Sequence, residues 1–361
     1  MRDVEQLAST MARLGAELVE HHGVTVPMRF ARPRRGHLAV RNGVGVTRHP
    51  WGLLDVTGTD RYAFLDDTLT CRVPTDDGGV TYGFLLDPDG RINADMYVVA
   101  TGERHLCLTA PGRAADLTAN LGERTFIQDV AVADATTDHV VLGVHGATAE
   151  SKLASVMPKG APPASPCTMS RGVIRDAGVT IVRLDAPAGE PGFAVVCHRP
   201  DAGAVFDALI SLGSVATPIG LETWRDLTLE AGTPLFETEL SGRTPNVCGQ
   251  LDAGVSLEKG CFVGQETVAR VANLGSPRDR LVGLQAPELP SPGCSVAGSG
   301  PREGVLLRRA TSPSLAAAIG FAVVPADLGE NASVTVGGHD ARVASLPFVD
   351  GSEQSARIPR Y

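Results

Sequence analysis

One short segment of the chain combines a thiol, an ammonium and two glycines at a spacing that could support chemistry. Residues 258–267 read Glu-Lys-Gly-Cys-Phe-Val-Gly-Gln-Glu-Thr. Gly260 and Gly264 allow the backbone to turn tightly and to approach a ligand or a partner closely. The ammonium of Lys259 would favour the thiolate form of Cys261 if the two side chains converge. The alternative is structural: the glycines form a turn, the thiol fills a small core site, and the charged side chains face solvent.

Composition and charge exclude several classes of function. The 361 residues include 32 Lys and Arg against 41 Asp and Glu, and this net charge of -9 argues against a general nucleic-acid binder. No run reaches the roughly 18 apolar residues that a membrane helix needs, and the N-terminus lacks a signal-peptide pattern. We therefore expect a cytoplasmic protein without a membrane partner. The seven cysteines are scattered without a CxxC pair, so the sequence predicts neither a disulfide framework nor a metal site.

Hydrophobic spacing predicts the elements that must position these side chains. The pattern predicts an amphipathic helix over residues 4–18 and a hairpin over residues 81–101 that turns at Pro88-Asp89-Gly90. Helices and strands alternate without a regular βαβ period, which favours an α+β fold. Short strands after the Pro- and Gly-rich boundary at residues 286–304 predict a small β-barrel. Further helices are predicted over residues 60–69, with Thr59 as cap, over residues 201–213, ended by Gly213, and over residues 221–232.

The segment rich in chemistry also resembles a known signature. Residues 259–266 are similar to the K-G-C-[FY]-x-G-Q-E motif of the YgfZ-type folate-binding proteins, which support iron–sulfur cluster assembly or repair. That family is related to the glycine-cleavage T-protein, the tetrahydrofolate-dependent aminomethyltransferase. T-proteins typically read K-G-D-F-x-G-K-E here, so the cysteine and the glutamine favour the YgfZ group. The matching residues are Lys259, Gly260, Cys261, Gly264, Gln265 and Glu266.

The resemblance to the T-protein covers nearly the whole chain. Residues 225–232, Arg-Asp-Leu-Thr-Leu-Glu-Ala-Gly, look like the family helix R-D-x-L-R-L-E-A-G. Residues 312–325 and 345–349 are similar to parts of the T-protein C-terminal barrel. The opening residues 14–30 are also similar, although the aromatic F-A-G-W segment of the family is His-His-Gly-Val at residues 21–24.

The resemblance implies a fold and a cofactor. It implies a T-protein-like ring of three domains around a central folate channel. Two intertwined α+β domains would occupy residues 1–275, and a C-terminal β-barrel would occupy residues 280–361. The implied cofactor is tetrahydrofolate or a one-carbon derivative. The implied partners are folate and iron–sulfur proteins or their assembly factors.

Two site residues carry over from the family by their place in its motifs. Asp95 matches the second aspartate of G-G-x-x-D-D-L, which implies a catalytic, proton-handling carboxylate that also contacts the cofactor. The preceding family aspartate is Ala94 here, and a hairpin-edge acid facing water is the structural alternative for Asp95. Arg225 matches the arginine that reaches folate, whose carboxylates suit a guanidinium, unless it is an exposed helix arginine. Ala194 stands where the family glutamate that holds the pterin is expected.

These observations leave three functions open. The first is a folate-binding, YgfZ-like accessory protein for iron–sulfur cluster assembly or repair, in which Cys261 is the catalytic thiol. The second is a tetrahydrofolate-dependent aminomethyl- or methyltransferase of the T-protein type. The third is a folate-binding scaffold that recruits a partner and catalyses nothing. The first interpretation rests on the signature, so the sequence alone does not decide whether the chain is an enzyme.

Overall fold

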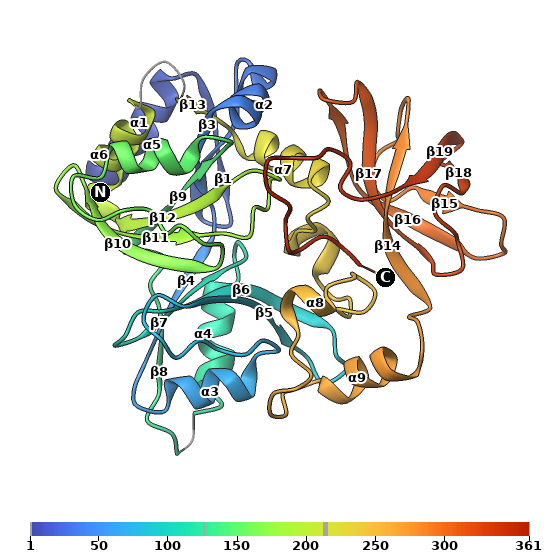
Figure 1. Cartoon of the computed structure of the whole chain (residues 1–361), viewed down its shortest axis with the longest axis horizontal. Coiled ribbons are helices and arrows are strands. Elements are labelled where there is room, and N and C mark those ends of the chain that lie inside the picture. The colour runs from blue at the N-terminus through green and yellow to red at the C-terminus, as the bar shows by residue number, and fades with distance from the viewer. Residues whose placement is uncertain (1, 126, 212–215, 361) are drawn as a thin grey trace.

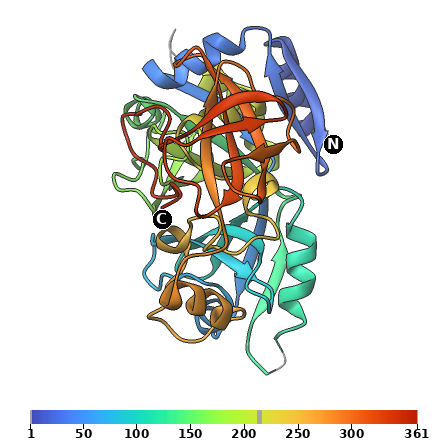
Figure 2. The same cartoon turned by 90° about the vertical axis from the view of Figure 1, so that its right-hand side faces the viewer.

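The chain forms two β-sheets that pack face to face, with helices on their outer faces and a β-barrel at one side (Figure 1). The computed structural model describes residues 2–125, 127–211 and 216–360. Figure 2 shows the barrel in front of the two-sheet body, with the N-terminal hairpin in dark blue beside it.

The first sheet has six strands in the order β10-β11-β12-β9-β3-β13. Its outer face is covered by helices whose apolar side chains, among them Met11, Leu153 and Phe206, are buried in one cluster. The strands are β3 Val44–His49, β9 His139–His145, β10 Thr168–Ile174, β11 Ala177–Arg183, β12 Gly192–His198 and β13 Ala216–Pro218, and the helices are α1 Arg2–Arg13, α5 Ala149–Ser155 and α6 Ala202–Ile210, with the short η1 Arg199–Asp201 before α6.

The second sheet has five strands in the order β5-β6-β7-β4-β8. Side chains alternate along β6: Val98 packs under helices α3 and α4, whereas Tyr97 and Val99 point into the core between the two sheets. The layers therefore follow the order helices, sheet, sheet, helices. The elements are β4 Gly52–Thr57, β5 Val80–Leu86, β6 Ile92–Ala100, β7 His105–Thr109, β8 Ala131–Asp134, α3 Arg61–Thr68 and α4 Ala114–Gly122.

Connecting elements lie where the two sheets meet the barrel. The hairpin of β1 and β2 and helices α2 and α7 bury a shared cluster that includes Val26, Val40 and Trp224. Helix α7 also contacts the barrel, where Arg308 donates to the Arg225 carbonyl at 3.1 Å. These elements are β1 Ala16–His21, β2 Val24–Phe30, α2 Pro33–Asn42, α7 Leu221–Glu230, the π-helical turn η2 Phe236–Leu240, α8 Leu251–Gly254 and α9 Gln265–Leu274.

Six strands close the C-terminal barrel in the order β14-β17-β16-β15-β18-β19. They are β14 Asp279–Ala286, β15 Ser295–Ala297, β16 Glu303–Ser312, β17 Ala317–Pro325, β18 Ser333–Val336 and β19 His339–Ala344. After β19 the chain leaves the barrel and returns to the two-sheet body, where Arg360 N–H donates to the Gly249 carbonyl at 3.1 Å (Figure 1). This return brings the last residues next to both sheets.

The α+β fold, the hairpin turn at residues 88–90 and the closed barrel are confirmed. The predicted first helix is too long, because Gly15 has a left-handed φ of 87° and Leu18 already belongs to strand β1. Helix α3 begins after Asp60, and the Thr59 hydroxyl donates to Asp129 at 2.9 Å instead of capping the helix. Residues 286–304 are not a domain boundary, since they run from the end of β14 through β15 to the start of β16 inside the barrel. Gly213 lies outside the described residues.

Candidate functional site

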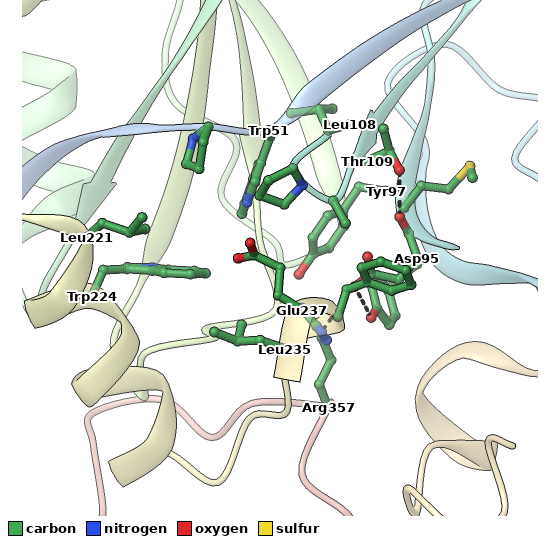
Figure 3. Close-up of a pocket in the computed structure, with 16 residues that line it drawn as sticks. Trp51, Asp95, Tyr97, Leu108, Thr109, Leu221, Trp224, Leu235, Glu237 and Arg357 are labelled. Atoms are coloured by element: carbon green, nitrogen blue, oxygen red, sulfur yellow. Dashed lines mark hydrogen bonds and ion pairs between the residues drawn. The ribbon is translucent and has the colours of Figure 1, made fainter. Parts of the chain in front are cut away.

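A cavity lies where the second sheet, α7, η2 and the C-terminal segment converge (Figure 3). Both tryptophans of the chain, Trp51 and Trp224, line the cavity. The other lining side chains are mostly apolar or aromatic, with a few polar groups among them; they include Tyr82, Asp95, Tyr97, Leu108, Thr109, Leu221, Leu235, Phe236, Glu237 and Arg357.

Asp95 is the buried carboxyl of this cavity. Strand β6 carries it, and the residue is 8% exposed. The Tyr82 hydroxyl donates to Asp95 Oδ2 at 2.7 Å, and Arg357 Nη2 lies 3.5 Å from the same oxygen. Burial raises the pKa of Asp95 by more than the Arg357 charge and the Tyr82 hydrogen bond lower it. A carboxyl with a raised pKa in an apolar cavity is suited to taking up or giving up a proton.

A second carboxyl, that of Asp185, is also buried. The Tyr97 hydroxyl donates to Asp185 Oδ1 at 2.5 Å, and burial raises the pKa of Asp185 as well. The positive charge of Arg357 balances both carboxyls. Its guanidinium is held in place 4.0 Å from the Tyr82 ring centre and donates to the Pro234 carbonyl at 2.8 Å. Burial alone would lower the pKa of Arg357, but the surrounding tyrosines and carboxyls raise it, so the guanidinium stays charged.

The aromatic wall of the cavity rests on two buried histidines. Trp51 stacks on His49 with ring centres 4.3 Å apart, and Trp224 meets the same imidazole edge-on at 4.8 Å. His49 Nε2 and His145 Nε2 lie 3.0 Å apart, so one nitrogen donates and the other accepts. Burial lowers the pKa of His145 to about 3 and also lowers the pKa of His49, so both rings are neutral at physiological pH. The pair is a neutral, packed support for the tryptophans.

Arg225 lies at the edge of the cavity and does not line it. Its neighbour Trp224 lines the cavity in its place. Arg225 Nη2 donates to Glu237 Oε2 at 2.6 Å, and Glu237 Oε1 contacts His21 Nε2 at 2.7 Å and His22 Nε2 at 3.2 Å. Burial alone would raise the pKa of Glu237, but Arg225 and His21 lower it by more than burial raises it, so the carboxylate stays ionised. Glu237 points into the cavity in Figure 3, so it links Arg225 and the two histidines to the pocket.

The signature segment lies outside the cavity, and none of its described residues lines it. Cys261 is exposed. The Lys259 ammonium is instead buried against the backbone carbonyl of Asp66, 3.8 Å from its carboxylate, and 5.6 Å from the Phe262 ring centre. Burial lowers the pKa of Lys259, with Asp66 and Cys71 as the acidic neighbours that oppose this shift. The partners found for this ammonium therefore do not include the Cys261 thiol.

Of the remaining signature residues, Gly264 packs against the hairpin that carries Asp95. Gly264 has a φ of 79°, and a Cβ there would lie 2.5 Å from the Asp87 carbonyl and 2.9 Å from Gly90 Cα. Gln265 begins α9, and its side chain accepts from the Phe262 N–H at 3.2 Å. Glu266 is exposed in the first turn of that helix, and a Cβ added at Gly260 would come no closer than 3.9 Å, from Asp67 Oδ1.

Two positions where the chain departs from the T-protein pattern lie in the core. Ala194 is fully buried between the two sheets on β12. Ala94 is buried under α3 and α4, on the face of β6 opposite Asp95. A carboxylate at residue 94 would therefore point away from the cavity.

Several residues that line the cavity were not predicted from the sequence. Tyr82 and Tyr97 had a partial signal, because they lie on the two strands of the predicted hairpin, but it is a bulge between Leu85 and Leu86 that brings them opposite each other. The two tryptophans were also recognisable as rare residues. Arg357 and Glu237 had no signal in their local pattern, since only the return of the C-terminal segment and the turn η2 bring them to β6.

Aromatic walls with a few polar groups among them are the usual lining of small-molecule sites in proteins. The chain belongs to the glycine-cleavage T-protein family, whose model, described as the GCVT N-terminal domain, matches residues 7–259. It is 31% identical to the aminomethyltransferase of Rubrobacter xylanophilus over an alignment of 346 residues that covers 93% of this chain and 91% of that protein. It is 29% identical over 357 residues to the aminomethyltransferase of Geobacillus kaustophilus, which covers 95% and 97%.

A solved structure has the same fold. The glycine cleavage system aminomethyltransferase T from Bartonella henselae superposes with a TM-score of 0.85 over 97% of this chain and 99% of that chain, at 24% identity. None of the described helices is long and apolar enough to cross a membrane.

Proposed function

We propose that the chain binds tetrahydrofolate, or a one-carbon derivative of it, in this cavity and transfers an aminomethyl or methyl group. The observation that carries the proposal is Asp95, a buried carboxyl with a raised pKa that faces an aromatic cavity in a chain of the T-protein family. The similarity to proteins named aminomethyltransferase over nearly their whole length supports a transferase of this type.

The residues present fit a planar, nitrogen-rich ring. Trp51, Trp224 and Tyr97 offer aromatic faces, and aromatic side chains favour stacked or edge-on contacts with such rings. Trp224 Nε1 is buried without a hydrogen-bond partner in the described part of the chain, so it could donate to a ligand. Arg225 is our candidate for the carboxylates of folate, and it would have to share its guanidinium with Glu237.

Each residue then has a distinct task. Asp95 takes up or releases the proton at its Oδ atoms, while the Tyr82 hydroxyl fixes Oδ2. Arg357 prevents two negative charges from standing unbalanced in the core. The tryptophans exclude water from the ring face. Bound tetrahydrofolate would supply the nitrogen that accepts the one-carbon unit.

The two tryptophans make the proposal directly measurable. We expect tetrahydrofolate to quench the intrinsic fluorescence of the chain, because both tryptophans line the cavity. Asp95→Asn should bind with similar affinity but lower turnover with lipoyl-carried or small methylated donors by about 100-fold or more. Asp89→Asn is the matched control, since Asp89 is exposed on the turn of the same hairpin. Absence of quenching, or full turnover by Asp95→Asn, would refute the proposal.

A second candidate function rests on the exposed Cys261. A YgfZ-like role in iron–sulfur cluster assembly or repair would use this thiol, which the fold leaves open to a partner protein. In that case Cys261→Ala should fail to restore iron–sulfur enzyme activities in a deletion strain, while Asp95→Asn restores them. Tetrahydrofolate binding without turnover, together with full activity of Cys261→Ala, would instead support a folate-binding scaffold.

A further inference from the structure

Two adjacent histidines and a glutamate meet at the edge of the cavity. His21 Nε2 and His22 Nε2 lie 2.7 Å and 3.2 Å from the same oxygen of Glu237. The three ligand atoms lie within 4.8 Å of one another. His21 and Glu237 are about four-fifths buried and His22 is half exposed, so the cluster is open to solvent on one side.

The backbone holds both imidazoles in place. The chain reverses from β1 to β2 through His22 and Gly23, whose φ angles are 51° and 75°, as in the two-residue hairpin turn with both central residues left-handed. The His22 ring lies against Gly112, where an added Cβ would come within 2.6 Å of His22 Nδ1. Any larger residue at this glycine would displace the imidazole, so two distant segments shape the position of His22.

We propose that His21, His22 and Glu237 form a binding site for a divalent transition-metal ion of the zinc class. Two imidazoles and one carboxylate are ligands that Zn²⁺ and its neighbours prefer, whereas Mg²⁺ and Ca²⁺ prefer oxygen ligands alone. Ligands about 2.0–2.1 Å from a tetrahedral ion lie roughly 3.3 Å from one another, so the present spacing needs only small side-chain movements. The three protein ligands leave the fourth position to water.

Arg225 is the outer partner of this site. It donates to Glu237 Oε2, which orients the carboxylate and leaves Oε1 facing the two imidazoles. Arg225 Nη2 also lies 3.3 Å from His21 Nε2, and this contact has to open when the ion takes the lone pair of that nitrogen. Carboxylates that bind metals are commonly held by such a second hydrogen bond.

The histidine pair is also a departure of this chain from the family it resembles. Residues 21–24 read His-His-Gly-Val where the resemblance to the T-protein predicts F-A-G-W. The proposed folate chemistry uses neither imidazole. The inference therefore does not depend on the proposed function, and it places the ion beside the cavity through Glu237.

Calorimetric titration of the metal-free full chain with Zn²⁺, repeated with Mg²⁺, tests the site. We expect one Zn²⁺ per chain and no Mg²⁺ binding. His22→Asn should weaken Zn²⁺ binding by more than about 100-fold, beyond the 10–100-fold typical of losing an outer partner. Asparagine tolerates the left-handed backbone at this exposed position, so the fold should persist, which circular dichroism checks. Glu237→Gln, which keeps the shape of the side chain, should weaken binding similarly.

Two control variants separate this site from other ligands of the chain. His139 and His198 form another ring pair, with centres 4.6 Å apart, so the double variant His139→Gln/His198→Gln should bind Zn²⁺ like the wild type. Cys261→Ala should also bind normally, and Co²⁺ should give an absorption spectrum without a thiolate band. Absence of Zn²⁺ binding by the wild type, unchanged binding by His22→Asn and Glu237→Gln, or loss in either control variant instead, would overturn the proposal.

Discussion

Replacing Arg357 by methionine removes the buried cation that faces Asp95 and Asp185. The variant loses a charge-assisted hydrogen bond to the Pro234 carbonyl, worth about 1.5–3 kcal/mol, and a desolvated cation–π contact with Tyr82, worth about 2 kcal/mol. The expected loss of unfolding free energy near neutral pH is therefore about 3–5 kcal/mol, as for other buried pairs that lose one partner.

The pH dependence of this loss has a definite sign. Burial raises the pKa of Asp95 and of Asp185 above the ordinary 3.8, so the folded state binds more protons than the unfolded state just above that pH. Stability from these groups therefore falls as the pH rises through the window between 3.8 and the folded pKa. Without Arg357 the folded pKa values rise further and the window widens upward. The deficit of Arg357→Met should accordingly be largest near pH 8 and smaller near pH 5, where protonation neutralises more of the carboxyls.

Urea unfolding followed by tryptophan fluorescence measures this deficit, because both tryptophans line the cavity. Arg360→Met is the matched control: Arg360 is an exposed arginine of the same C-terminal segment, and its loss should change stability by less than about 0.5 kcal/mol. A deficit of equal size at both pH values, or equal destabilisation by the two variants, would refute the view that Arg357 balances the buried carboxyls.

Three further predictions follow from single contacts. Gly264→Ala should destabilise the chain by roughly 1–2 kcal/mol in urea unfolding, because residue 264 has a left-handed φ and a Cβ would clash with the Asp87 carbonyl; Gly260→Ala, with its nearest atom at 3.9 Å, should be nearly neutral. Burial raises the pKa of Asp226 to about 7, so the folded state is destabilised at higher pH, where this carboxyl ionises. Asp226→Asn should therefore unfold at a higher urea concentration than the wild type when the pH is above 7, and at the same urea concentration near pH 4. Cys261→Ser should remove the fastest phase of thiol alkylation, since burial raises the pKa of Cys71 and Cys248 to about 12.

The sequence predicts those parts of the fold that depend on local signals. The hairpin turn at residues 88–90 contains Pro-Asp-Gly, whose preferences specify a tight reversal. A bulge between Leu85 and Leu86, which no local pattern predicts, then sets the register that places Asp95 diagonally across from Tyr82. Local periodicity fails at the N-terminus, because Leu18 continues the apolar spacing of the helix although Gly15 has already ended it. An apolar residue facing a core looks the same in a helix and in a strand over so short a stretch.

The candidate site could be predicted only in part, for a topological reason. The motif match predicts Asp95, which lines the cavity, whereas Arg225 lies at the edge of the cavity and its neighbour Trp224 is in the lining. Helix neighbours point about 100° apart, so Trp224 lines the cavity while Arg225 lies at its edge and stays a candidate for a ligand that reaches beyond the pocket. Arg357 is brought to the site by a long return from the barrel, and no local pattern encodes such a return.

The signature segment and the cavity are joined through one hairpin. Gly264 packs against Gly90, the turn glycine between β5 and β6, and a Cβ on Gly90 would come within 3.1 Å of Thr267. Asp95 lies a few residues along β6 from this contact, and Cys261 lies a few residues before it on the exposed side. The Gly264–Gly90 contact therefore ties the signature segment to the hairpin whose second strand carries Asp95. Its effect on the pocket is structural: it supports the turn before β6, while Tyr82 and Arg357 hold the Asp95 carboxyl itself.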